Sequence, residues 1–158
     1  MKITSQAELE KNIKLSTITF PEIACKHCKT FFFTPNSKKF LTIMDHFFTR
    51  NGKQKINSWY RCPAHHLAEK EKEIGRKLTE SEKKSALQSG HVQLVAIDLG
   101  GKDPERLFLR AAAFGEFNGI GLYPWGIHID MKPRRAFWVS QAGKYTYFSS
   151  PSDIISRF

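Results

Sequence analysis

The chain has 158 residues, 41% of them hydrophobic, and its formal net charge at pH 7 is +10. This length predicts one domain over residues 1–158, and the hydrophobic content is ordinary for a globular protein. No run approaches the roughly 18 to 20 apolar residues of a membrane-spanning helix, so the composition excludes a transmembrane segment.

In chain order, residues 1–35 are expected to form an irregular lead-in to the fold. A helix with an apolar stripe is predicted over residues 35–51, and residues 55–61 indicate a strand. Residues 64–88 are strongly charged, and Thr79–Glu82 reads as a capping box before a short helix. This charged segment is therefore expected to be a solvated helical insertion.

The second half of the chain favours strands. Residues 92–99 predict a core strand that Asp98 interrupts, and a helix is expected over residues 103–114. Short antiparallel strands are then predicted over residues 119–123, 126–130, 136–140 and 145–148. Helices followed by strands predict an α+β fold with a small antiparallel sheet flanked by helices.

Three residues of this half form a candidate metal site. Asp98 interrupts an apolar run, and a buried carboxylate is costly unless it is paired or bound to a cation. With His91 and His128 it makes the three-ligand set of a catalytic zinc site, which keeps a fourth position open for water. Because an odd offset in a regular strand points side chains to opposite faces, His91 and Asp98 can share an ion only if the chain bends between them.

The residues around these ligands resemble a known family. Ser89–Asp98 resembles the Ser-x-His-x-x-Gly-x-Ala-x-Asp signature of zinc D-Ala-D-Ala carboxypeptidases and peptidoglycan endopeptidases, with Leu94 in place of the glycine. Residues 57–65 resemble that family's Ser-Gly-Tyr-Arg-Cys-Pro-x-His segment. Residues 119–138 resemble its Gly-x-Gly-x-Tyr-Pro, Val-His-x-Asp and Arg-x-Trp ending. The match runs from about Phe40 to Trp138 and is closest to small murein peptidases and phage lysins.

The resemblance implies a fold, a metal and a reaction. The fold would be the one that these peptidases share with the hedgehog signalling domain, and zinc would be held by His91, Asp98 and His128. The activity would be cleavage of an amide bond in peptidoglycan stem peptides or cross-links, as in an endolysin. The alternatives are a D-alanyl-D-alanine carboxypeptidase and a non-catalytic zinc-containing binding protein of the same fold.

The catalytic base is less clearly marked. Several relatives carry a carboxylate three residues before the last histidine ligand, and here that residue is Trp125. Asp130 is the nearest carboxylate and shares a strand face with His128. It is expected to act as the base or to orient His128, and pairing with Arg134 or Arg135 is the third possibility.

Three further residues are predicted to bind substrate. Arg61 matches a substrate-binding arginine of the relatives and can hold a peptide carboxylate through a bidentate pair. Ser89 is expected to hydrogen-bond to Asp98 or to the substrate, and Tyr123 to an oxyanion. The other histidines near these blocks are left off the metal site: His46, His65 and His66.

The charge and the metal motif together predict the partners. Basic residues are scattered and form no recognised nucleic-acid-binding module, so peptidoglycan peptides and an anionic bacterial envelope are favoured over nucleic acid. A monomer is expected. The first ten residues lack the apolar core of a secretory signal, so the protein would act in the periplasm or be released from the cytoplasm during lysis.

The cysteines leave alternatives open. Cys25-Lys-His-Cys28 has the spacing of half a zinc knuckle, but a second pair of ligands is missing unless Cys62 or a histidine joins it. A redox pair is a second possibility. Two structural thiols near the start of the fold are the favoured interpretation.

Overall fold

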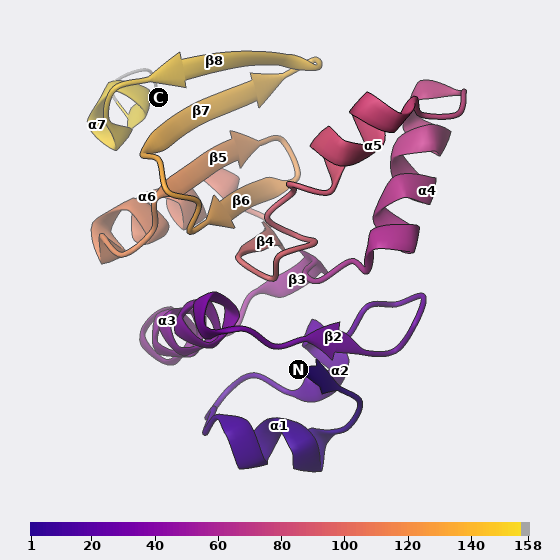
Figure 1. Ribbon diagram of the computed structural model, residues 1–158. Coiled ribbons are helices and arrows are strands. Elements are labelled where there is room, and N and C mark those ends of the chain that lie inside the picture. Colours follow the sequence, from indigo (N-terminus) through magenta and orange to yellow (C-terminus); the bar gives the residue numbers. More distant parts are fainter. Residues whose placement is uncertain (156–158) are drawn as a thin grey trace.

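The computed structural model describes residues 1–155 and has the α+β architecture that the sequence predicted (Figure 1). The helices in this range are α1 (Gln6–Asn12), α2 (Phe20–Ile23), α3 (Pro35–Asn51), α4 (Pro63–Ile74), α5 (Glu80–Ala86), α6 (Pro104–Phe114) and α7 (Pro151–Ile155). The strands are β1 (Lys2–Ile3), β2 (Phe31–Phe32), β3 (Lys55–Ser58), β4 (Ala96–Gly100), β5 (Gly119–Tyr123), β6 (Gly126–Asp130), β7 (Ala136–Gln141) and β8 (Lys144–Phe148).

The main sheet has six strands in the order β3-β4-β6-β5-β7-β8, and β1 and β2 form a separate antiparallel pair. The prediction of a purely antiparallel sheet is wrong at one place, because β5 and β7 are parallel. Both edges of β6 are occupied, by β4 and by β5. The chain that leaves β6 therefore reverses and pairs with the free edge of β5, to which it runs parallel.

The first 35 residues are not the irregular lead-in that was expected. They contain β1, α1, α2 and β2, and Ser5 caps α1 by accepting a hydrogen bond from the Glu8 amide. Leu9 and Ile23 are buried in the same hydrophobic cluster as residues of the sheet and of α3. The segment therefore forms part of the core, at the bottom of Figure 1.

Helix α6 covers one side of the sheet, and α3 lies against α6. Helix α3 is capped by a Thr34–Ser37 capping box and ends at Asn51, with Gly52 as its C-cap, close to the predicted boundaries. Helix α6 packs on β5 and β6 and also contacts α3. Strand residues that face α6 are apolar and buried, such as Ile97, Ile120 and Ile129. The opposite face of the sheet is therefore available for a polar site.

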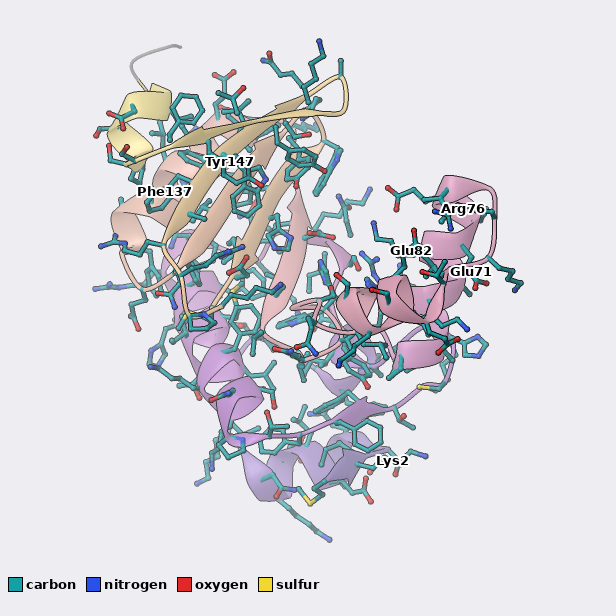
Figure 2. All side chains as sticks on the ribbon, turned by 45° about the horizontal axis from the view of Figure 1, so that its top comes forward. Lys2, Glu71, Arg76, Glu82, Phe137 and Tyr147 are labelled. Carbon is teal, nitrogen blue, oxygen red and sulfur yellow. The ribbon has the colours of Figure 1, made fainter. Side chains whose placement is uncertain are left out.

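Helices α4 and α5 form the predicted charged helical insertion beside the sheet (Figure 1). Arg76 pairs with Glu82 and Lys77 pairs with Glu71, near the tip where the two helices meet (Figure 2). One residue differs from this solvated pattern, since His66 on α4 is buried. Among the described residues, no helix has the length and apolar character needed to cross a membrane.

Candidate metal centre

The centre is built along one row of residues that pair across the sheet. Asp98 on β4 is paired with His128 on β6, and His128 is also paired with Gly121 on β5. The row continues to Ser58 on β3 at one end, and to Trp138 on β7 at the other. Since alternate residues of a strand point to opposite faces, the whole row lies away from α6.

His91 reaches the same face through a turn, not through a strand. Residues 90–94 are a turn and β4 begins only at Ala96, so the strand predicted over residues 92–99 starts four residues late. Leu94 has φ = 53°, the left-handed conformation in which a residue other than glycine is uncommon. Its side chain is fully buried, which offsets a backbone strain of about 1 to 2 kcal/mol. The bend expected between His91 and Asp98 is therefore present, although leucine occupies the position.

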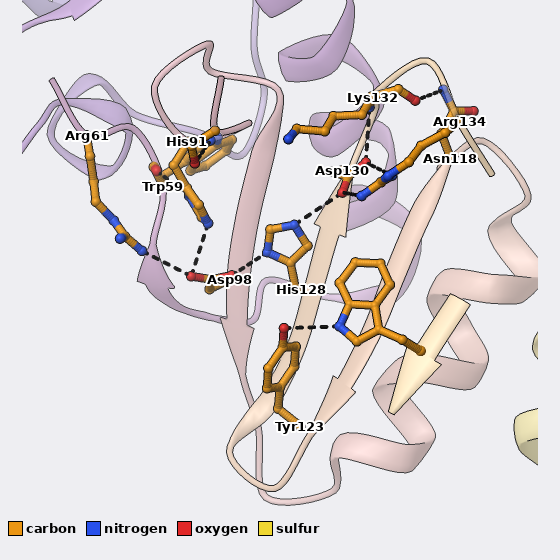
Figure 3. A network of polar contacts seen from close by, with 12 residues as sticks. Trp59, Arg61, His91, Asp98, Asn118, Tyr123, His128, Asp130, Lys132 and Arg134 are labelled. Atoms are coloured by element: carbon orange, nitrogen blue, oxygen red, sulfur yellow. Dashed lines mark hydrogen bonds and ion pairs between the residues drawn. The ribbon is translucent and has the colours of Figure 1, made fainter. Parts of the chain in front are cut away.

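The three predicted ligands converge (Figure 3). Nε2 of His91 lies 3.2 Å from Oδ2 of Asp98, and Nδ1 of His128 lies 2.8 Å from Oδ1. One donor atom from each of the three lies within 4.8 Å of the others. Tetrahedral zinc with bonds of about 2.0 to 2.1 Å needs neighbouring N and O donors about 3.3 Å apart. The chemistry and spacing of this donor set fit zinc.

Each histidine has a partner that directs one nitrogen toward Asp98. The Nδ1 atom of His91 is 2.7 Å from the Trp59 carbonyl oxygen, which can only accept, so Nδ1 donates and Nε2 is the nitrogen that faces Asp98. The Nε2 atom of His128 is 3.3 Å from Oδ2 of Asp130, which leaves Nδ1 for a metal. The Trp59 carbonyl was not predicted, because a backbone acceptor has no signature in the sequence.

Asp130 is enclosed by donors. The guanidinium of Arg134 binds both of its oxygens at 2.9 Å, and the Lys132 amide donates to Oδ1 at 3.0 Å. With His128 on Oδ2, the acceptor sites of this carboxylate are filled, and its side chain is 1% exposed. The position favours the orienting role over that of a base, and the pairing with Arg134 is present as well.

Charge is concentrated at this site in the metal-free protein. Burial would raise the pKa of Asp98, but His128 and His91 hold it well below its usual range. Burial opposes the ionisation of Asp130 too, yet His128 and Arg134 lower its pKa to about 2. Against the opposing effect of burial, the two carboxylates raise the pKa of His128 to about 9. A cation that binds here must displace the proton on His128.

The three residues predicted to bind substrate make different contacts around the candidate metal centre. Arg61 donates through Nε to Ser58 at 3.0 Å, its Nη2 is 3.5 Å from Asp98, and it lines a cleft of about 600 Å³. Tyr123 accepts from the Trp138 indole at 3.0 Å, and burial raises its pKa to about 12. Ser89 is not hydrogen-bonded to Asp98: its hydroxyl accepts from the His91 amide at 3.3 Å.

An aromatic wall beyond His128 was not predicted. The Trp138 ring is 5.6 Å from the His128 ring and is buried, while Tyr147 on β8 contacts Trp138 at 6.2 Å. Trp125 stacks on Tyr123 at 4.8 Å and is 43% exposed. The wall gives one side of the centre an apolar lining, opposite the cationic side formed by Arg61. The alternation of Tyr145 and Tyr147 along β8 is the signal that could have indicated it.

The centre therefore combines a metal-binding set of two imidazoles and one carboxylate, a cation on one side and a phenol that retains its proton. Such a set can bind zinc and polarise a carbonyl group between Arg61 and Tyr123. Comparisons of the chain with protein-family models, with curated proteins and with solved structures found no match.

Proposed function

We propose that the protein is a zinc-dependent peptidase that hydrolyses an amide bond in peptidoglycan stem peptides or cross-links. The convergence of His91, Asp98 and His128 carries the proposal, since these are the residues that the peptidase-like segments mark as ligands. A zinc ion held by them would supply a Lewis acid for the substrate carbonyl and for the attacking water.

Arg61 would recognise a carboxylate of the peptide. Its Nη2 atom is farther from Asp98 than the roughly 2.7 to 2.9 Å of a tight charged hydrogen bond, so the guanidinium is not committed to that partner. The adjoining cleft is also lined by Lys26, Lys53 and Lys55, against Glu22 and Glu69. Stem peptides carry free carboxylates, which this cationic cleft complements.

Tyr123 would stabilise charge on the carbonyl oxygen. The Trp138 N–H occupies one acceptor site of its hydroxyl, and the raised pKa keeps the phenol protonated at neutral pH. The O–H is therefore a donor that can hydrogen-bond to an oxyanion. Asp130 would act as a positioning residue that holds His128, through the contacts that enclose it.

A second candidate function is binding without hydrolysis. One observation favours it: Trp125 stands where related peptidases carry a carboxylate, and Asp130 is enclosed by Arg134. A site that holds zinc but lacks an accessible carboxylate would bind the peptide and turn it over slowly, because general acid–base catalysis typically contributes about 10²- to 10⁴-fold.

One experiment tests both. Purified bacterial peptidoglycan is incubated with the protein, with the protein after chelation, and with chelated protein after zinc is restored, and the released fragments are identified by mass. Zinc-dependent fragments or free D-alanine support the peptidase and name the bond. His128→Ala, the matched control, should lose the activity and about one zinc ion per chain.

The remaining outcomes separate the candidates. Zinc-dependent retention of the protein on peptidoglycan with no released product would favour binding alone. A His128→Ala protein that keeps the zinc content of the natural protein would overturn the ligand set on which both candidates depend.

A further inference from the structure

All three cysteines of the chain meet at a second place. Cys25 and Cys28 lie between α2 and β2, and Cys62 is the residue that precedes α4. Their sulfur atoms lie within 4.8 Å of one another, and all three are free thiols. Cys25 and Cys62 are buried, whereas Cys28 is exposed. Two segments more than thirty residues apart in sequence thus bring three soft ligands together.

A histidine lies beside this cluster. Nδ1 of His65 is 3.4 Å from Sγ of Cys25. Tetrahedral zinc, with bonds of about 2.3 Å to sulfur and 2.0 to 2.1 Å to nitrogen, places neighbouring S and N donors about 3.5 Å apart. The spacing in sequence agrees, since Cys62-Pro-Ala-His65 repeats the two-residue gap of Cys25-Lys-His-Cys28. This pair would supply the second half of the knuckle that the spacing of Cys25 and Cys28 left incomplete.

We propose that Cys25, Cys28, Cys62 and His65 hold a second zinc ion, in a closed structural site of three thiolates and one imidazole. Four protein donors leave no open position, which is the arrangement of a structural zinc site and not of a catalytic one. The soft sulfur donors also separate it chemically from the His91, Asp98 and His128 set.

The backbone around the cluster is shaped to present these donors. The Lys29 amide donates to the Cys25 carbonyl at 2.8 Å, and the Cys25 amide donates to the Thr30 carbonyl at 3.0 Å. Lys29 adopts φ = 56°, so the chain turns sharply just after Cys28. A disulfide between any two of the thiols would leave the third beside it as a free thiol, whereas one zinc ion uses all three.

The second ion would position Arg61. Cys62 follows Arg61 directly, and the Arg61 amide donates to the His91 carbonyl at 3.3 Å. An ion that joins the Cys25–Cys28 turn to Cys62 would fix the chain on the side of Arg61 away from Asp98. Arg61 would then be held between two metal sites.

Cobalt(II) provides the test, because thiolate ligands give it an intense charge-transfer absorption that nitrogen and oxygen ligands do not. The metal-free full chain is titrated with cobalt(II), and zinc is measured in the protein as purified. We expect the thiolate band, and about two zinc ions per chain if both sites fill. Cys28→Ser is the first variant, because an exposed position tolerates the change. It should lose most of the band and about one zinc ion.

Two controls assign the fourth ligand and the site. His65→Gln should weaken cobalt binding and alter the band. The His27 ring stacks on His65 with centroids 5.9 Å apart, so His27→Gln is the matched control and should leave cobalt affinity and the thiolate band unchanged. A loss caused by His27→Gln and not by His65→Gln would overturn the assignment of His65. His128→Ala removes a ligand of the other centre, so its thiolate band should persist whether or not the proposed peptidase activity exists.

A measurement on the unaltered chain covers the case in which Cys28→Ser does not fold. A mercurial reagent is added to the purified protein while a zinc-sensitive dye reports released zinc. Release of about one ion as the three thiols react would support the site. A wild-type protein with no thiolate band and no zinc released by thiol modification would overturn it.

Discussion

The candidate metal centre depends on single residues that fix the side chains of its proposed ligands. Asp130 and the Trp59 carbonyl each hold the nitrogen of a histidine that faces away from Asp98. Both are buried against protein, so they act on a metal only through His128 and His91.

Asp130→Asn tests orientation. An amide cannot keep the charged contacts to Arg134 and His128, so zinc affinity at this site should fall roughly 10- to 100-fold. Activity should recover in excess zinc. Zinc titration and turnover are measured together, and normal zinc affinity with a loss of about 10²- to 10⁴-fold in turnover would instead make Asp130 the base.

Arg61→Lys tests recognition of a carboxylate. Lysine keeps the charge but loses the planar fork, so kcat/KM on a stem peptide with a free carboxylate should fall while zinc content is unchanged. The same peptide with that carboxylate amidated should show little difference between the two proteins. Arg50→Lys, on α3, serves as the matched control. Equal kcat/KM of Arg61→Lys and of the natural protein on the peptide with the free carboxylate would remove Arg61 from recognition.

Among the strands, Gly121 leaves the space that the Trp138 ring occupies in the cross-strand row of Asp98 and His128. A Cβ atom on Gly121 would lie 2.2 Å from the Trp138 indole, which crosses β5 at this point toward His128. Gly121→Ala must therefore displace Trp138 and should destabilise the protein by about 1 to 3 kcal/mol. At Gly101 a Cβ would meet only ordinary contacts from 3.6 Å, so Gly101→Ala should change stability by about 0.5 kcal/mol or less.

Chemical denaturation of the two alanine variants measures this difference. Equal free energies of unfolding for the two variants would show that Trp138 can move without loss of stability and that the fold does not require the space above Gly121.

The elements that could be predicted are those with local signals. Helix α3 has Pro35 at its start and Gly52 at its end, and the β5–β6 hairpin follows the alternation of apolar residues. Helix α1 was missed because its seven residues bury only Leu9, too few for a period to be recognised. The parallel pairing of β5 with β7 was missed because it depends on which strand edges remain free, a non-local property.

In the candidate metal centre, too, the features with a local signal in the sequence could be predicted and the others could not. His91, Asp98 and His128 could be predicted because their side chains carry the chemistry, and all three meet. Of the two partners predicted for Ser89, Asp98 is not the one it contacts, because the turn at residues 90–94 directs the Ser89 hydroxyl to the His91 amide. A hydrogen bond from Ser89 to the substrate stays a prediction. A turn built on a left-handed leucine leaves no ordinary pattern in the sequence.

At the scale of the whole molecule, one buried histidine links stability to pH. His66 lies inside the fold, and burial, followed by the charge of Arg61, lowers its pKa from 6.5 to about 4. Between these two values the unfolded chain takes up a proton that the folded chain does not, so stability falls as the pH falls from 6.5 toward 4. The loss attributable to His66 should be on the order of 2 to 3 kcal/mol.

Unfolding of the natural protein and of His66→Gln is compared at several pH values in this window. Asp98 and Asp130 contribute to the acid sensitivity of both proteins, so the difference between the two curves isolates His66. Parallel curves would contradict the assignment.

The pairing of Asp98 with His128 would also make binding of the proposed zinc ion depend on correct assembly of the sheet. If β6 slipped by one residue against β4, every side chain would exchange faces, and Ile127 or Ile129 would stand opposite Asp98 while His128 entered the core. Only the correctly registered sheet can then bind the ion. By mass action, zinc would stabilise the correct register of β4 and β6 relative to every slipped register, because only the correct register binds the ion.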